Sequence, residues 1–69
     1  MTQGERIINY IEHFGSITPM DAFIDLGITK LATRISELKR DGYEFTQTWE
    51  KSKNRFGDIS MYMRYKLKN

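Results

Sequence analysis

Residues 15–45, GSITPMDAFIDLGITKLATRISELKRDGYEF, contain the signals that decide the fold. Thr18 is a suitable helix N-cap, and Pro19 suits the first helical position. Asp21, three residues after Thr18, completes a capping box, in which the two side chains satisfy free backbone amides at a helix start. Gly27 follows after only about two helical turns, and glycine readily takes the left-handed conformation that ends a helix. The pattern predicts a short second helix followed by a tight turn.

A third helix is predicted over Thr29–Arg40, directly after this turn. We expect Thr29 to cap it and Asp41-Gly42 to stop it. Three apolar residues recur at i, i+4 and i+7 and therefore share one side, which we expect to be buried: Leu31, Ile35 and Leu38. The opposite side is polar, and Lys30 and Arg34 flank it; this polar side carries Thr29, Thr33, Ser36, Glu37 and Arg40.

The residues that precede this stretch predict a first helix. Thr2 and Glu5 have capping-box spacing, and Gly15 is placed to end the helix. Between them lies an apolar stripe at helical spacing, formed by Ile7, Ile8, Ile11 and Phe14. In the second helix we expect an apolar face of Ala22, Phe23 and Leu26, with Met20 and Ile24 beside it.

From Tyr43 the hydrophobic period changes from helical to twofold, which predicts strands. Residues 59–67 alternate apolar and polar, and we expect their odd-numbered side to pack on the helices. Lys51–Asp58, KSKNRFGD, predicts the loop between two antiparallel strands. Trp49 is expected in the core or at a sheet edge, and the methionines at 20, 61 and 63 as core filler.

Helix, short link, helix, turn, helix and hairpin follow one another in the order of a winged helix-turn-helix. This is an α+β fold in which three helices pack on a C-terminal antiparallel β-hairpin, called the wing. A chain of 69 residues is short enough that we expect one domain over residues 1–69.

The composition excludes several functional classes. Cysteine is absent and His13 is the only histidine, so we expect no thiolate or histidine metal site and no nucleophilic triad. A glycine-rich phosphate loop is also missing. We therefore predict no catalytic residues, no cofactor and no enzymatic activity. The apolar runs are too short to span a bilayer, and we expect a cytoplasmic protein.

Positive charge is concentrated in two segments. Lys30–Arg40 carries four basic residues against one acidic residue, and the residues after Glu50 carry six against one. The rest of the chain is acidic, which leaves a net charge of +2. A segregated pattern of this kind forms either a basic face that neutralises phosphates or an ordinary solvated surface.

Residues 15–45, with the closing RYKL at 64–67, resemble the small helix-turn-helix domains common in bacteriophage and prophage genomes. The most specific segments are SITPMDAF, GITKLATRI and LKRDGY. The resemblance covers most of the chain. It implies DNA binding and a phage context more firmly than a defined biological role.

The candidate contacts to double-stranded DNA lie at the start of the third helix and in the wing loop. A helix fits the major groove, where Arg34 suits a bidentate contact to guanine and Thr33 a phosphate or a thymine methyl. Basic residues of the wing loop suit the adjacent backbone or minor groove. The predicted DNA-binding residues are Thr29, Lys30, Thr33, Arg34, Lys53 and Arg55. Transcription regulation and an accessory role in recombination are the two roles we expect.

A second functional class stays open. The same fold also serves as a protein–protein interaction module without DNA binding. The near-neutral net charge and the acidic first half of the chain would weaken non-specific attraction to DNA. A homodimer or another protein partner is compatible with the sequence, and Tyr62, on the otherwise polar side of its strand, is a candidate for self-association.

Overall fold

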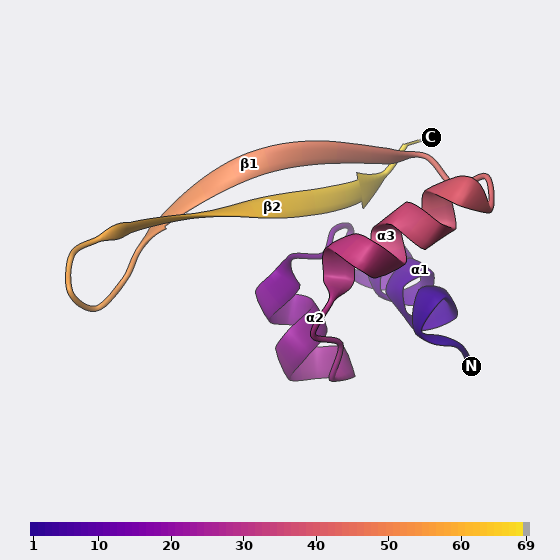
Figure 1. Cartoon of the computed structure of the whole chain (residues 1–69), viewed down its shortest axis with the longest axis horizontal. Coiled ribbons are helices and arrows are strands. Elements are labelled where there is room, and N and C mark those ends of the chain that lie inside the picture. Colours follow the sequence, from indigo (N-terminus) through magenta and orange to yellow (C-terminus); the bar gives the residue numbers. More distant parts are fainter. Residues whose placement is uncertain (69) are drawn as a thin grey trace.

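A computed structural model describes residues 1–68 and has three helices followed by a β-hairpin (Figure 1). The elements are α1 (Gln3–Phe14), α2 (Pro19–Leu26), α3 (Leu31–Arg40), β1 (Phe45–Lys53) and β2 (Ile59–Leu67). The molecule measures 39 × 23 × 21 Å, because the hairpin projects past the helices. The predicted α+β architecture of three helices and a C-terminal hairpin is confirmed.

The predicted caps of α1 and α2 form. Thr2 Oγ1 accepts a hydrogen bond from the Glu5 amide at 3.1 Å. Thr18 Oγ1 likewise accepts from the Asp21 amide, and Asp21 accepts in return from the Thr18 amide, which makes a complete capping box. Gly15 and Gly27 end the two helices with φ of 92° and 69°, values that favour glycine.

The start of α3 differs from the prediction. The helix begins at Leu31, and its N-cap is Lys30, which makes no side-chain cap hydrogen bond. Thr29 was expected to cap α3, and this prediction was wrong. Because Lys30 has φ −124° and ψ 62°, outside the helical region, the first helical residue comes later and Thr29 lies before the cap.

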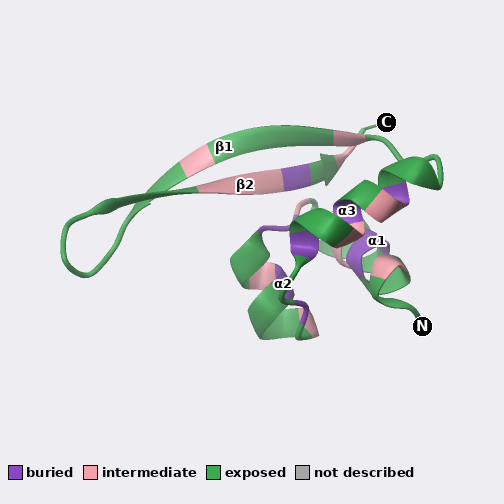
Figure 2. Cartoon of the chain, viewed as in Figure 1, coloured by how far each residue is buried: buried purple, intermediate pink, exposed green. Residues whose placement is uncertain are grey.

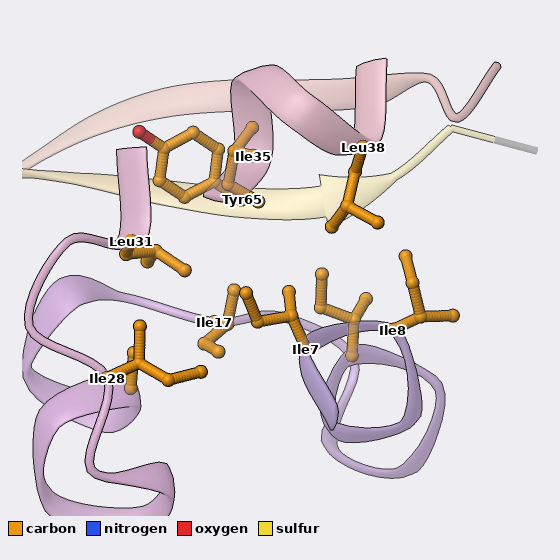
Figure 3. Close-up of a cluster of buried hydrophobic side chains, with 10 residues drawn as sticks. Ile7, Ile8, Ile17, Ile28, Leu31, Ile35, Leu38 and Tyr65 are labelled. Atoms are coloured by element: carbon orange, nitrogen blue, oxygen red, sulfur yellow. The ribbon is translucent and has the colours of Figure 1, made fainter. Parts of the chain in front are cut away.

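The core lies where the three helices meet one another and the base of the hairpin (Figures 2 and 3). Ile7 from α1 and Ile17 from the link before α2 are fully buried, and Ile35 of α3 is 2% exposed. Tyr65 of β2 covers this cluster. Ile17 and Tyr65 exchange two backbone hydrogen bonds of 2.9 Å, which fix the link to the edge of β2. The remaining buried apolar residues are Ile8, Ile11, Ala22, Ile28, Leu31 and Leu38.

Helix α2 buries less than its sequence predicts. Ala22 is fully buried and Leu26 half-buried, whereas Phe23 is 58% exposed. Met20 and Ile24, three residues before and one after Phe23, are also exposed. The prediction that Phe23 belongs to the buried face and that Met20 fills the core was wrong, because α2 is short and only the side around Ala22 meets α3 and β2. Phe14, at the end of α1, is likewise exposed.

The hairpin is longer than predicted, and its loop is shorter. The strands pair in register from Phe45↔Leu67 to Lys53↔Ile59, so the loop contains only residues 54–58 and not all of Lys51–Asp58. The odd-numbered side packs on the helices as expected near the base of the hairpin, at Met63, Tyr65 and Leu67. Farther out it is exposed, and the expectation of burial was wrong there: Ile59 and Met61 are 66% and 56% exposed. Trp49 is 63% exposed in a two-stranded sheet, in which every strand is an edge, so it lies at the sheet edge and not in the core.

Candidate nucleic-acid interface

The polar side of α3 is uncovered. Thr33, Ser36 and Arg40 are exposed on the side opposite the buried stripe of the helix. The hairpin does not cover this side; its base packs against the core instead (Figure 2). A two-turn polar helical surface, free of the chain's own side chains, has the shape that enters a major groove.

The flanks of α3 hold two cations in contacts within the protein. Arg34 Nη1 donates to Glu37 Oε1 at 2.8 Å, and both side chains are partly exposed. On the other flank, Lys39 Nζ donates to Gln47 Oε1 of β1 at 2.7 Å. Arg34 lines a pocket together with the first residues of α1, so its side chain lies on the side of α3 that faces α1. The structure places Arg34 beside the exposed polar side of α3 and not at its centre.

The N-terminal end of α3 has free backbone donors. Threonine hydroxyls cap α1 and α2, but no side chain caps α3 at its N-cap residue. The first amides of a helix have no partner within the helix and carry partial positive charge, which favours an anion. Thr29 and Lys30 are both exposed beside these amides. This end of the helix therefore combines amides, a hydroxyl and an ammonium group that suit a phosphate.

The wing is basic and exposed toward its tip. Lys53 ends β1 and Arg55 lies in the turn, and both are exposed, as is Lys51. With Asp58 as the acidic residue, the segment Lys51–Asp58 has a net charge of +2. β1 runs back over α3, so that the turn lies beyond the N-terminal end of α3 (Figure 1). The wing turn thus lies on the N-terminal side of α3, at the end of the molecule that extends away from the helices (Figure 1).

Asn54 gives the turn a defined shape. Its Oδ1 accepts hydrogen bonds from the amides of Phe56 and Asp58, at 2.9 and 3.0 Å. The Asn54 amide donates to the Asp58 carbonyl at 2.9 Å, and Gly57 has φ 87°. These bonds form an Asx-type turn. The turn presents Arg55 and Phe56 to solvent, and the Phe56 side chain is 86% exposed.

Arg64 is not part of the free basic surface. Its Nε donates to Glu50 Oε2 at 2.7 Å, and its Nη1 donates to Ser16 Oγ at 2.7 Å. The Glu50 carboxylate raises the pKa of Arg64, and the hydrogen bond from Arg64 lowers the pKa of Glu50 below its ordinary value of 4.5. Part of the positive charge counted after Glu50 therefore serves to join β1, β2 and the link before α2.

Two groups of exposed residues were not among the predicted contacts. Ser36 and Arg40 lie with Thr33 on the free side of α3, and the helical period of the sequence already placed them there. Phe56 lies at the tip of the wing. The loop pattern KSKNRFGD placed it in a turn but left open whether its ring folds back onto the sheet or faces a partner.

Residues 1–68 contain neither a cluster of metal ligands nor a membrane-spanning helix. Within residues 1–68, no group of three or more histidine, cysteine or acidic residues is placed to hold a metal ion. In the same part of the chain, every helix is too short and too polar to cross a membrane.

Comparison with known proteins assigns the chain to a family. The family model described as a winged helix-turn-helix domain matches residues 2–69. No curated protein and no solved structure matches the chain. The match extends over all but the first residue and agrees with the order of three helices and a hairpin. The chain belongs to the family of winged helix-turn-helix domains.

Proposed function

We propose that this protein binds double-stranded DNA with α3 in the major groove and the wing on the neighbouring backbone or minor groove. A winged helix-turn-helix domain is typically a non-enzymatic DNA-binding module. The observation that carries the proposal is the free polar side of α3, together with exposed cations at the start of α3 and in the wing.

Base contacts are assigned to the exposed side of α3. Thr33 faces the base edges, where its methyl and hydroxyl groups suit thymine or a phosphate. Arg34 reaches guanine by exchanging its contact with Glu37. An exposed ion pair of this type contributes only about 0–1 kcal/mol, whereas a bidentate arginine–guanine contact discriminates by about 1–3 kcal/mol. The ion pair that Arg34 gives up is therefore small beside the discrimination that the guanine contact provides.

Phosphate contacts are assigned to both ends of the interface. Thr29 and Lys30 bind one phosphate together with the free amides of α3. Lys53 and Arg55 bind phosphates along the wing, and Arg40 binds at the far end of α3. Four such contacts release about four condensed counterions, so affinity should fall by about 10²-fold between 50 and 200 mM salt.

The biological role we propose is regulation of transcription, or an accessory role in recombination, of bacteriophage or prophage type. It requires no cofactor and no catalytic residue, and it places the protein in the cytoplasm. The residues 15–45 that resemble small phage domains support this role.

The test is a fluorescence anisotropy titration with random duplex DNA over a series of salt concentrations. Lys30→Ala and Arg34→Ala should each weaken binding, and Lys30→Ala should also reduce the magnitude of the salt slope by about one unit. Arg6→Ala is the matched control, because Arg6 is exposed on α1 on the side away from its buried isoleucines. Wild-type affinity in both α3 variants would contradict the proposal.

One observation favours a second candidate function, a protein-interaction module. Met20, Phe23 and Ile24 form an exposed apolar patch on α2, and such patches often mark protein contacts. A module of this kind would show little affinity for duplex DNA even at low salt. The titration described above therefore separates the two candidates.

A further inference from the structure

Phe56 is held in water at the tip of the wing. Its side chain is 86% exposed, which makes it more exposed than any other large apolar residue of the described chain. Leaving a phenylalanine in water is unfavourable relative to burial. The ring does not fold back onto the hairpin, although Trp49 and Met61 leave apolar surface available there. The ring is therefore available for burial by a partner.

The turn around Phe56 is ordered by hydrogen bonds. Asn54 Oδ1 accepts from the Phe56 amide itself at 2.9 Å, and a second bond to Asp58 closes the turn. Gly57, which follows Phe56, has no side chain and takes a positive φ. Phe56 thus lies at a narrow, pre-shaped tip, and burial of its ring requires little further ordering of the backbone.

The charges around Phe56 indicate a polyanion. Arg55 is adjacent in the turn, and Lys53 lies three residues before Phe56 at the end of β1; both are exposed. An apolar wedge flanked by cations is the arrangement with which architectural proteins insert between base steps from the minor groove, while the cations bind the flanking phosphates.

We propose that Phe56 inserts between two neighbouring base pairs of duplex DNA from the minor groove and bends the duplex. This inference rests on the proposed DNA binding and adds to it a residue and a deformation. Insertion unstacks one step, so it favours the easily unstacked TA and CA/TG steps over A-tracts. Specificity then arises partly from deformability of the DNA and not only from contacts of α3.

Trp49 is not placed to insert between base pairs. It lies within β1, opposite Met63, and the hairpin continues for four more residue pairs beyond it toward the turn. A side chain on the body of a two-stranded ribbon is too far from the tip to reach between base pairs in a groove about 6 Å wide. Among the residues that the structure describes, 1–68, only the tip turn offers an aromatic ring in a suitable place.

The test uses a 30-base-pair duplex with dyes at both ends for energy transfer and with 2-aminopurine at a central TA step. Saturating wild-type protein should raise both the energy transfer and the 2-aminopurine fluorescence, because bending shortens the duplex and insertion unstacks the probe. Phe56→Ala should abolish both changes and weaken binding by on the order of tenfold, with an unaltered salt slope because no charge is removed. Phe56→Leu, which retains an apolar wedge, should keep most of both signals.

Phe23→Ala is the matched control, since it removes an exposed phenylalanine from α2 and should leave both signals as in the wild type. Circular dichroism should be the same for all three variants, because neither ring is part of the core. Equal bending and fluorescence for Phe56→Ala and the wild type would overturn the insertion while leaving the DNA binding by α3 in place. Absence of any binding by the wild-type protein would overturn both proposals.

Discussion

Single side chains decide how much of the positive charge is free. Arg64 is joined to Glu50 and Ser16 at 2.7 Å each. It therefore holds three parts of the chain together, namely β1, β2 and the link before α2. In the sequence, Arg64 is one of the six basic residues after Glu50. A count of charges along the sequence cannot distinguish a cation that pairs within the protein from one that is free to bind DNA. The ion pair of Arg64 and Glu50 contributes to the stability of the fold instead, and this contribution depends on pH.

Acidification should weaken the fold partly through Glu50. The pKa of Glu50 is lowered by the hydrogen bond from Arg64, so the stabilisation is complete above the ordinary pKa of 4.5 and is lost as the pH falls through the lower folded-state value. Glu50→Gln should therefore show a smaller drop in the free energy of unfolding between pH 7 and pH 3, measured by urea titration. Arg64→Gln should flatten the profile in the same way. Identical pH profiles for Glu50→Gln and wild type would rule out this contribution.

Burial, and not hydrophobicity alone, sets the cost of substitution. Ile35 is 2% exposed, and Ile35→Ala should lower the free energy of unfolding by about 2–5 kcal/mol. Phe23 is 58% exposed, and Phe23→Ser should change it by no more than about 0.5 kcal/mol. Urea unfolding of the two variants gives the comparison. A large loss of stability in Phe23→Ser would show that the patch on α2 is covered, for example by a second copy of the chain.

The residues of α2 also show where sequence reasoning stops. Helical spacing correctly identified Ala22 and Leu26 as inward-facing, because those positions follow from the period alone. It also assigned Phe23 to the buried face, since an apolar residue next to a buried one extends the stripe. How wide the buried stripe is depends on how closely α2 approaches its neighbours. That distance is a property of the tertiary packing and is not encoded in the local pattern.

The starts of α1 and α2 follow from local capping interactions, whereas the start of α3 does not. The Thr18–Asp21 box is a short-range pattern and was predicted from its spacing, as was the cap at Thr2. α3 offered only a threonine at position 29, with Ala32 in place of an acidic residue three positions later, and the backbone at Lys30 leaves the helical region and delays the first turn. The turn after Gly27 must place α3 across the core, and this constraint overrides the local preference for a threonine cap.

Two threonine substitutions separate these cases. Thr18→Ala should lower the free energy of unfolding by about 0.5–2 kcal/mol, because it leaves a helix amide without its partner. Thr29→Ala should change stability by no more than about 0.5 kcal/mol, because Thr29 lies outside α3. Thermal or urea unfolding measures both. Equal losses would mean that Thr29 caps the helix after all.

The whole molecule consists of a helical core and a hairpin that extends beyond it. The sequence predicted the order of the elements and the inward side of the hairpin base, because both follow from hydrophobic periods. It did not predict that the same apolar alternation continues into solvent at Met61 and Ile59. The strands are longer than the part of the hairpin that the helices cover. Local sequence patterns do not specify how far the helices extend along the strands, so they do not predict which residues are left uncovered. The DNA contacts stay predictions, because the structure contains no DNA against which local patterns could be compared.

If the outer wing serves binding and not folding, it should be removable. Replacing residues 51–61 by Asn-Gly joins Glu50 to Tyr62, which already face each other in register, through a favoured two-residue turn. All buried apolar residues lie outside the deleted segment, so the free energy of unfolding should change by no more than about 1 kcal/mol. The shortened protein loses Lys53 and Arg55, the two wing residues assigned to phosphates, and its salt slope for DNA binding should therefore fall in magnitude by about two units. Urea unfolding and anisotropy titration measure the two effects on the same sample. An unfolded variant would show that the outer wing stabilises the core, and an unchanged salt slope would show that the wing does not contact DNA.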